Sequence, residues 1–187
     1  GTEVVASMLA ERTVANSEAT QRTYPWAGTV IPCGIDRDAF AAAPRQDSSA
    51  PSILFVGTFR NRKRGRLLWE AFRDVVRPAL PDAELWMVCD DAPPAPGVHV
   101  LGRLSQADLV ARYRSAWVFC LPSSYEGFGV PYAEALAAGT PIVATPNPGA
   151  REVLDEGRFG VLAEPAQLGP ALVDLLRDAP RRARMVT

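Results

Sequence analysis

From residue 51 onward, six short apolar runs alternate with segments whose apolar residues recur every three or four positions. The runs are rich in Val, Ile, Leu and Phe and have the length of strands, which is typical of a parallel sheet covered on both faces. The intervening segments have the period of helices, and Ser105 is placed to cap the helix that contains Leu109 and Tyr113. The sequence therefore predicts an α/β fold with a doubly wound parallel sheet, in which ligands bind at the carboxyl ends of the strands. The six runs are ILFVG (53–57), ELWMVC (84–89), VHVLG (98–102), WVFCLP (117–122), PIVAT (141–145) and FGVLAE (159–164).

Charge and composition exclude several classes of function. The formal net charge of −1 argues against a nucleic-acid-binding protein, which would carry a basic excess. No apolar run approaches the roughly 20 residues of a membrane-spanning helix, and no secretory signal is expected. The three cysteines, Cys33, Cys89 and Cys120, together with the single histidine, His99, do not form a metal-ligand pattern. We therefore expect no metal site, and we expect Cys89 and Cys120 to be buried, reduced thiols of a cytoplasmic protein.

The beginning of the chain has a different character. The length of 187 residues favours one domain of ordinary size with a fragment of a second. An amphipathic stretch, Val4 to Leu9, lies near the start, and residues 36–52 are rich in Asp, Ala, Pro and Ser, which is typical of a connecting loop. We expect residues 1–30 to be a remnant of another lobe with its linker, and residues 31–187 to form one domain.

The most informative segment is PSSYEGFGVPYAEALAAGTPIVAT, residues 122–145, which has the pattern of a strand end, a loop and a helix. Gly127 and Gly129 can take positive φ and let backbone N–H groups approach a ligand closely. The helix N-terminus behind them favours an anion such as a diphosphate. Glu134 lies one turn into this helix, eight residues after Glu126, and its carboxylate can accept two hydrogen bonds from adjacent sugar hydroxyls. The spacing alone equally allows Glu134 to complement the helix dipole and Glu126 to be solvated.

A second strand, loop and helix carries a cluster of basic residues. Five of the residues 60–66 are Arg or Lys, and a charge run of this kind is usually a solvated surface. Lys63 is the only lysine among 20 Lys and Arg residues, and its compact ammonium charge is not interchangeable with a guanidinium. At a strand end facing the amides of residues 127–130, Lys63 would neutralise phosphate charge as a leaving group departs.

Together these segments resemble the nucleotide-binding C-terminal lobe of retaining GT-B glycosyltransferases, the group 1 or family 4 type, which includes mannosyl-, glucosyl- and N-acetylglucosaminyltransferases. The resemblance spans nearly the whole chain in family order and implies a Rossmann-like lobe. The Glu-x7-Glu element from Glu126 to Glu134, inside PSSYEGFG, is highly specific. The matching segments are VANSEAT (14–20), VIPCGID (30–36), FVGTFRNRK (55–63), EAF (70–72), the run 100–154 and GVLAEP (160–165).

The resemblance implies a role for each matching residue. Glu134 would bind the ribose hydroxyls of the nucleotide, and Glu126 would contact the donor sugar near the reacting carbon. Lys63, helped by Arg62, would stabilise the departing diphosphate, so Glu126 and Lys63 are the expected catalytic residues. The backbone of the next four residues, which we name the glycine loop, would hold the diphosphate and the sugar. The glycine loop consists of Gly127, Phe128, Gly129 and Val130.

Further positions extend the predicted site or depart from the family pattern. The backbone near Leu104 and Ser105 would meet the nucleobase. Thr58, also expected beside the donor phosphates, stands where many members carry arginine, so that one phosphate charge would come from Arg60 or be absent. Gly149 is alone where relatives often carry two glycines.

The resemblance also implies the chemistry of the whole protein. We expect a metal-independent reaction without a cofactor, with a UDP- or GDP-linked sugar as the donor. The acceptor would be bound by an N-terminal lobe that is missing here, and any membrane contact would be made through that lobe of a cytoplasmic protein. Because the chemistry of this family occurs between two lobes, we expect the isolated chain to bind a nucleotide sugar but to transfer it poorly.

Two other classes of function fit the same architecture. One is a nucleotide-sugar epimerase or a phosphorylase, and a glucan phosphorylase would need a pyridoxal-bearing lysine, for which Lys63 is the sole candidate. The other is a non-catalytic module that senses nucleotide sugars, which the presence of Glu126, Glu134 and Lys63 disfavours. Product analysis with the donor alone separates an epimerase from a transferase.

Overall fold

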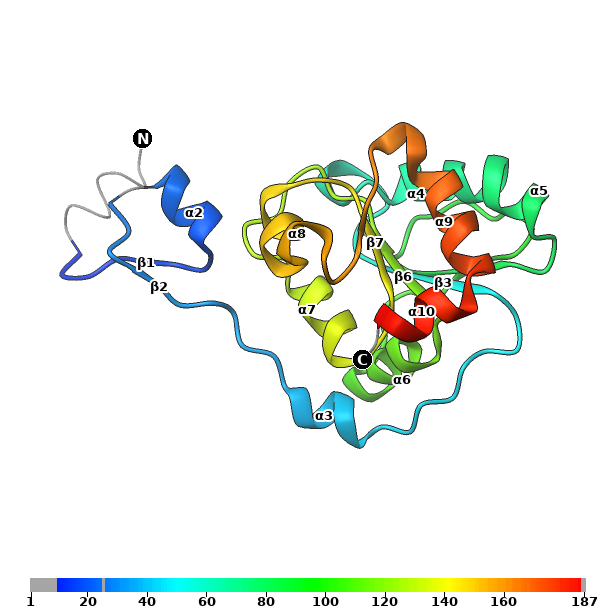
Figure 1. Ribbon diagram of the computed structural model, residues 1–187, viewed down its shortest axis with the longest axis horizontal. Helices are drawn as coiled ribbons and strands as arrows, with labels where there is room; N and C mark the ends of the chain where they lie inside the picture. The colour runs from blue at the N-terminus through cyan, green and yellow to red at the C-terminus, as the bar shows by residue number, and fades with distance from the viewer. Residues whose placement is uncertain (1–9, 25, 186–187) are drawn as a thin grey trace.

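The computed structural model describes residues 10–24 and 26–185, and the stretch from Val4 to Leu9 lies outside them. Two parts follow one another along the chain (Figure 1). Residues 10–30 form a small unit, in which one helix packs beside two short parallel strands. A linker then leads into a layered α/β domain. The small unit consists of β1 (Val14–Ala15), α2 (Glu18–Thr23) and β2 (Thr29–Val30).

A six-stranded sheet forms the centre of the larger part, and all neighbouring strands in it are parallel. The strand order is β5-β4-β3-β6-β7-β8, so the chain runs from β3 to one edge, returns to the centre at β6 and continues to the other edge. Each strand overlaps one of the predicted apolar runs, and the predicted doubly wound parallel sheet is confirmed. The strands are β3 (Ser52–Val56), β4 (Glu84–Val88), β5 (Val98–Val100), β6 (Val118–Leu121), β7 (Ile142–Ala144) and β8 (Val161–Leu162).

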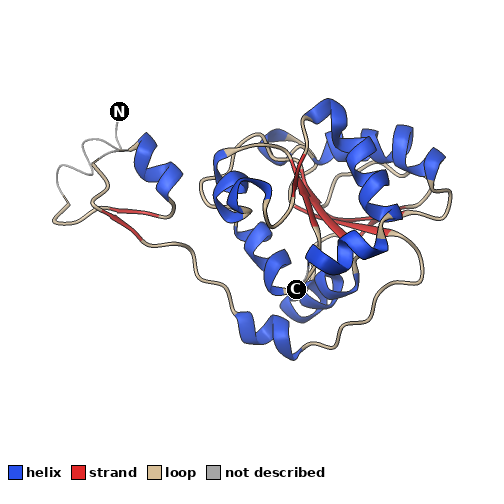
Figure 2. Cartoon of the chain, viewed as in Figure 1, coloured by secondary structure: helices blue, strands red, loops and turns tan. Residues whose placement is uncertain are grey.

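Helices cover both faces of this sheet, and Figure 2 shows the strands running between them. Right-handed crossovers in opposite directions from β3 and from β6 place α4 and α7 on opposite faces. The last long helix, α9, packs on α4 and completes that layer. The helices are α4 (Gly65–Ala71), α5 (Arg77–Ala79), α6 (Gln106–Ser115), α7 (Val130–Ala137), α8 (Pro148–Val153), α9 (Leu168–Arg177) and α10 (Ala179–Met185). Shorter turns are η1 (Asn61–Lys63), the π-helical η2 (Phe72–Val76), η3 (Asp155–Gly157) and η4 (Pro165–Gln167).

The linker contains a helix that its composition did not indicate. The prediction of a loop over residues 36–52 is wrong in its first part, because α3 (Arg37–Ala42) forms there. Asp36 caps this helix by accepting a hydrogen bond from the backbone N–H of Ala39 at 3.0 Å. Phe40, only 1% exposed, anchors α3 to Tyr113 of α6, with ring centroids 5.9 Å apart. A single large apolar residue produces no helical period, so the pattern could not reveal the helix.

The apolar runs supply the core. Leu54 and Phe55 of β3 and Phe119 of β6 are fully buried, and each contributes roughly 1.5–3 kcal/mol by leaving water. Cys89 and Cys120 are free and buried, as predicted. The central strands are therefore the best-anchored elements, and the loops that leave their carboxyl ends have a rigid base. Among residues 10–24 and 26–185, no helix has both the length and the apolar character needed to cross a bilayer.

Candidate functional site

The candidate site lies where β3 and β6 end side by side in the middle of the sheet. These neighbouring strands are where the chain changes direction across the sheet, and the loops that follow them turn into helices on opposite faces. In open parallel sheets this switch point forms a crevice at the carboxyl ends of the strands. The loop after β3 carries Arg62 and Lys63, and the loop after β6 carries Glu126 and the glycine loop. The structure thus brings the two predicted segments together.

Glu126 is the centre of a compact charge network. Its carboxylate is 5% exposed, and Lys63 Nζ lies 2.7 Å from Oε1 while Arg62 Nη1 lies 2.7 Å from Oε2. Ser123 donates a further hydrogen bond to Oε1 at 2.6 Å. Burial acts to raise the pKa of Glu126, but the hydrogen bonds from Lys63, Ser123 and Arg62 outweigh burial and hold the pKa below its ordinary value. Glu126 is therefore an ionised carboxylate, not the solvated side chain that its spacing also allowed.

The loop that carries the two cations has a fixed shape. Asn61 and Arg64 have φ of 60° and 50°, in the left-handed region that asparagine tolerates better than most residues. The carbonyl of Arg62 accepts a hydrogen bond from the backbone N–H of Ser124 at 2.8 Å. Arg62 also donates from Nη1 to the carbonyl of Tyr125. Two loops far apart in sequence are thus joined through backbone as well as side chains, which keeps Lys63 beside Glu126.

The glycine loop leads directly into α7. Gly129 has φ of 95°, and a Cβ there would lie 2.5 Å from the Tyr132 ring, so only glycine fits. Gly127 does not use this freedom, since it lies outside the positive-φ positions; its carbonyl instead accepts a hydrogen bond from Ser17. No side chain of the described residues caps the first turn of α7. The N-terminus of this eight-residue helix therefore presents a partial positive charge, and its N-cap lies three residues after Glu126, the partner of Lys63 and Arg62.

Glu134 lies in α7 on the same side as the charge network. Its Oε2 accepts a hydrogen bond from the hydroxyl of Tyr113 at 2.9 Å. Burial raises the pKa of Glu134 above its ordinary value, although the Tyr113 hydrogen bond and the charge of Lys63 act to lower it. The charge of Lys63 acts on both glutamates. Lys63 therefore links the two glutamates electrostatically, a relation that the spacing alone left open.

The remaining predicted residues lie outside this network. Ser105 caps α6, accepting a hydrogen bond from the Asp108 N–H at 3.2 Å and donating one to its carboxylate at 2.6 Å. Leu104 lines a separate cavity of about 400 Å³. Thr58 is exposed and donates to the carbonyl of Arg60, so it shapes the cationic loop. The part of the chain that the structure describes has no cluster of three or more His, Cys, Asp or Glu side chains placed to hold a metal ion.

Besides Ser123 in the loop after β6, the sequence pattern missed two polar residues from other elements that contact the site. Tyr113 in α6 was recognised only as part of an apolar helix face, and Ser17 only as part of a family segment. Ser17 is fully buried; its Oγ accepts from the Thr20 N–H at 2.9 Å and donates to the Gly127 carbonyl at 2.5 Å. Both residues meet partners distant in the chain, so no local spacing could identify the contacts.

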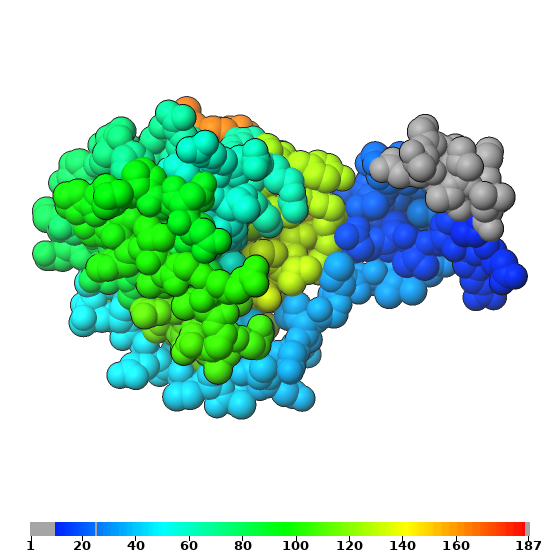
Figure 3. Space-filling model, turned by 180° about the vertical axis from the view of Figure 1, so that it is seen from behind, coloured from blue at the N-terminus to red at the C-terminus, as the bar shows by residue number. Residues whose placement is uncertain are grey.

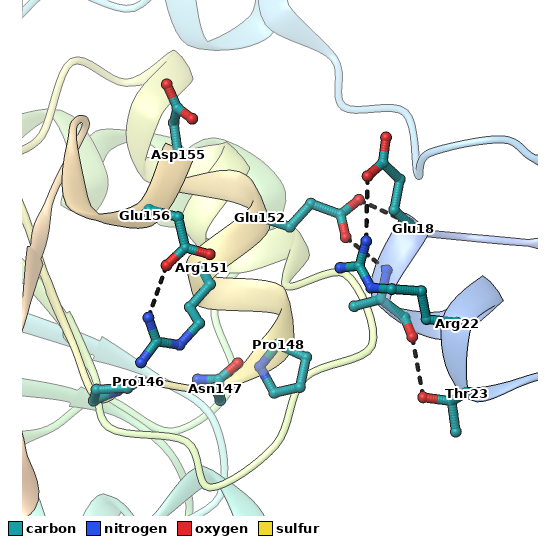
Figure 4. Close-up of a pocket in the computed structure, with 11 residues that line it drawn as sticks. Glu18, Arg22, Thr23, Pro146, Asn147, Pro148, Arg151, Glu152, Asp155 and Glu156 are labelled. Atoms are coloured by element: carbon teal, nitrogen blue, oxygen red, sulfur yellow. Dashed lines mark hydrogen bonds and ion pairs between the residues drawn. The ribbon is translucent and has the colours of Figure 1, made fainter.

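The small unit of residues 10–30 is docked beside the glycine loop by α8. The two carboxylate oxygens of Glu152 accept hydrogen bonds from the backbone N–H groups of Glu18 and Ala19, both at 2.9 Å (Figure 4). The helices α2 and α8 frame a cavity of about 900 Å³. Seen from behind in Figure 3, the blue residues of this unit lie against the yellow-green residues around 125–150. A carboxylate of the larger part thus satisfies the N-terminus of α2.

We expect Glu152→Ala to accelerate amide hydrogen exchange in α2 by about tenfold, because two hydrogen bonds to a charged acceptor are lost. The global free energy of unfolding, measured with urea, should change by less than about 0.5 kcal/mol, since the core is untouched. Glu156→Ala is the matched control, because the Glu156 carboxylate pairs with exposed Arg151 on the same cavity wall. Equal exchange rates in both variants would contradict the docking role of Glu152.

Comparison with known proteins extends these observations. The family model described as Glycosyl transferases group 1 matches residues 50–178. The phosphatidyl-myo-inositol mannosyltransferase of Mycobacterium tuberculosis is 33% identical over 177 residues, covering 83% of this chain and 47% of that protein. The D-inositol 3-phosphate glycosyltransferase of Kineococcus radiotolerans is 30% identical, covering 94% and 51%. The chain spans about half the length of the curated relatives it matches.

Solved structures show the same fold. Anabaena Alr3699/HepE in complex with UDP-glucose superposes with a TM-score of 0.80 at 19% identity, over 97% of this chain and 58% of that protein. WaaG, a glycosyltransferase involved in lipopolysaccharide biosynthesis, superposes with a TM-score of 0.77 at 18% identity, over 92% and 55%. The predicted Rossmann-like lobe of the GT-B type is confirmed.

Proposed function

Because the chain belongs to the glycosyl transferases group 1 family, we propose that it is the donor-binding lobe of a retaining glycosyltransferase. In this proposal the whole protein moves a hexosyl group from a UDP- or GDP-linked sugar to an acceptor. The observation that carries the proposal is the ion pair between Lys63 and Glu126, 2.7 Å apart, with Glu126 three residues before the N-cap of α7. The relatives named mannosyltransferases support a hexosyl group.

The positive charges of the site are suited to a diphosphate. Lys63 and Arg62 provide two full charges, and the backbone amides at the start of α7 provide a partial one. Together they stabilise the charge that grows on the leaving diphosphate as the glycosidic bond breaks. These groups supply the role that a divalent cation has in other transferases, so the proposed reaction needs no metal or cofactor.

The two glutamates are suited to the two sugars on either side of the diphosphate, the transferred sugar and the ribose. Glu126 is held ionised and oriented by three donors, as a residue that contacts the transferred sugar near its reacting carbon requires. Glu134 lies one helical turn further along, where its carboxylate accepts hydrogen bonds from the ribose hydroxyls. Thr58, Leu104 and Ser105 remain predictions, with the backbone of the last two facing the nucleobase.

The acceptor is proposed to bind to an N-terminal lobe, of which residues 1–30 are the end. Residues 31–187 are the donor domain, and the reaction occurs in the cleft between the two. The isolated chain then binds the donor with little turnover. We propose a cytoplasmic location, with any membrane contact made by the N-terminal lobe. A pyridoxal role for Lys63 is disfavoured, because its amine is paired with a nearly buried carboxylate.

The proposed function is tested by nucleotide binding and by one substitution. A thermal-shift screen of UDP-, GDP- and ADP-sugars first identifies the base, because a ligand of the native state raises the melting temperature. Glu134→Gln should then weaken the selected nucleoside diphosphate about 10- to 100-fold in calorimetric titration, since hydrogen bonds to a charged acceptor are lost. Glu70→Gln, on the surface of α4, is the control of identical chemistry. Unchanged affinity in Glu134→Gln would remove the ribose role.

A further inference from the structure

We infer that Tyr113 is a positioning residue for the nucleotide: its hydroxyl fixes the orientation of the Glu134 carboxylate, and the linker helix α3 holds the tyrosine ring in place. This inference rests on the proposed function, because it gives Glu134 a ribose to bind. It adds a residue to the donor site from α6 and a support from α3, neither of which belongs to the loops that carry the charges.

The first step is the hydrogen bond itself. Tyr113 has no exposed surface, so its phenolic proton has no access to water and must find a protein acceptor. Glu134 Oε2 lies 2.9 Å away, whereas the next acceptor, the Pro131 carbonyl, lies at 3.5 Å, near the limit of a hydrogen bond. The proton is therefore directed to Glu134. Among the described residues, Tyr113 is the hydrogen-bond donor to this carboxylate, and Oε1 has no such donor.

The second step is the rigidity of the tyrosine. Its ring is packed against Phe40 of α3 and Phe119 of β6, with centroids 5.9 and 5.2 Å away. Its backbone carbonyl accepts a hydrogen bond from Thr140 Oγ1 at 2.6 Å. Two aromatic rings and a backbone hydrogen bond thus hold Tyr113, so the position of its hydroxyl is fixed. The Glu134 side chain, hydrogen-bonded to this fixed hydroxyl, therefore loses most of its rotational freedom before a ligand binds.

The third step is chemical constancy. Burial, followed by the charge of Glu134, raises the pKa of Tyr113 well above its ordinary value, so the phenol remains a donor throughout the neutral range. The same hydrogen bond acts against the burial of Glu134 and favours its ionised form. An ionised carboxylate with one oxygen bonded to Tyr113 presents its other oxygen to a pair of adjacent hydroxyls. A phenylalanine could fill the same space but could not do this.

The test is Tyr113→Phe in the 187-residue chain, titrated with UDP and 2′-deoxy-UDP, or with GDP and 2′-deoxy-GDP, whichever pair the wild type binds. We expect affinity for the ribonucleotide to fall about 5- to 30-fold, by analogy with other buried hydrogen bonds to charged groups. Affinity for the deoxynucleotide should change much less, so the ratio of the two affinities moves toward one. A residue that only stabilises the fold would weaken both ligands equally.

Tyr132→Phe is the matched control, because it removes a hydroxyl that is equally buried but bonded to the Leu121 carbonyl. It should leave the ratio unchanged. If circular dichroism shows that Tyr113→Phe is unfolded, Phe40→Leu is the second variant, because it removes the ring that packs on Tyr113 and keeps the hydroxyl. We then expect the ratio of ribonucleotide to deoxynucleotide affinity to fall about two- to fivefold.

The outcomes separate the inference from the proposed function. If the wild type binds neither UDP nor GDP, the proposed function fails and the inference fails with it. If the wild type prefers the ribonucleotide and Tyr113→Phe retains that preference, or Tyr132→Phe loses it equally, the inference alone is overturned. A wild type that binds both nucleotides equally removes the ribose role of Glu134 and the role of Tyr113 together.

Discussion

Lys63→Met is expected to lower the affinity for UDP or GDP about 10- to 100-fold, while the affinity for uridine or guanosine stays within about twofold. The loss corresponds to about 1.5–3 kcal/mol for a hydrogen bond between charged groups. Only 15% of the Lys63 side chain is accessible, against 55% for Arg62, and in the proposed complex its charge meets the diphosphate and not the nucleoside. Calorimetric titration with the nucleoside and its diphosphate measures both affinities.

The variant should also lose stability, because Glu126 keeps only Arg62 and Ser123 as partners. Since the pKa of Glu126 is below its ordinary value in the folded protein, its network stabilises the fold above the unfolded pKa. That stabilisation disappears as the pH falls through the lowered folded pKa. The stability difference between wild type and variant is therefore largest near neutral pH and shrinks in acid, as urea titrations at several pH values would measure.

Two further variants make the Lys63 result specific. Arg66→Met removes the same charge from an exposed pair with Glu70, three residues further along, and should leave diphosphate binding unchanged. Lys63→Met combined with Glu126→Gln also removes the buried carboxylate that has lost one of its two cations, and should recover stability but not diphosphate affinity. A Lys63→Met protein that loses nucleoside and diphosphate affinity equally would show that Lys63 has no phosphate role.

Gly149→Ala is expected to reduce nucleoside diphosphate affinity at least tenfold and to cost about 1–3 kcal/mol of folding free energy. A Cβ at this position would lie 2.6 Å from the Phe128 carbonyl oxygen and 2.8 Å from that of Glu126. Neither obstacle is a flexible side chain, so the backbone of the glycine loop must move. Helix propensity predicts the opposite sign, because alanine favours a helix by about 1 kcal/mol over glycine.

Gly34→Ala is the matched control for Gly149→Ala. Within residues 10–24 and 26–185, apart from its two neighbours in the chain, no heavy atom lies within 4 Å of the Cβ it would add, and its φ lies outside the left-handed region. Urea denaturation and calorimetric titration of both variants measure the two effects. If Gly149→Ala binds nucleoside diphosphate as well as Gly34→Ala does, then α8 does not determine the position of the glycine loop.

The sequence predicted the sheet because its central strands β3, β6 and β7 are buried along nearly their whole length and each therefore forms an apolar run. It also placed Lys63 at a strand end opposite the amides of residues 127–130, but it did not predict the ion pair between Lys63 and Glu126. It did not reveal the hydrogen bond from Tyr113 to Glu134, because the position of Tyr113 in its helix is also typical of a core residue. Nor did it reveal α3, which is anchored by one apolar residue, Phe40. It did not reveal that Ser17 holds Gly127 across 110 positions. Such contacts depend on tertiary packing, which leaves no local period.

The parts of the site therefore differ in how they were found. Spacing and chemistry within 122–145 located the glutamates. The partners of Glu126 come from the two charged loops, whereas the group that orients Glu134 comes from α6 and is supported by the linker helix α3. A segment with the apolar period of a core helix, such as α6, can carry one polar group that contacts the site, and that group does not change the period. The assignment of the nucleobase to residues near Leu104 stays a prediction, because Ser105 is engaged in capping α6.

Because Lys63 is the only lysine of these 187 residues, a label on lysine amines reports on the candidate site alone. Isotope-labelled methyl groups added to amines by reductive methylation give one side-chain signal in nuclear magnetic resonance, besides that of the terminal amine, and Lys63 retains its charge. The labelled methyl groups are attached to Nζ, the atom that lies 2.7 Å from the Glu126 carboxylate in the site proposed to bind the donor. Ligand arrival can therefore be followed at one atom, without a mutation and without a fluorescent tag.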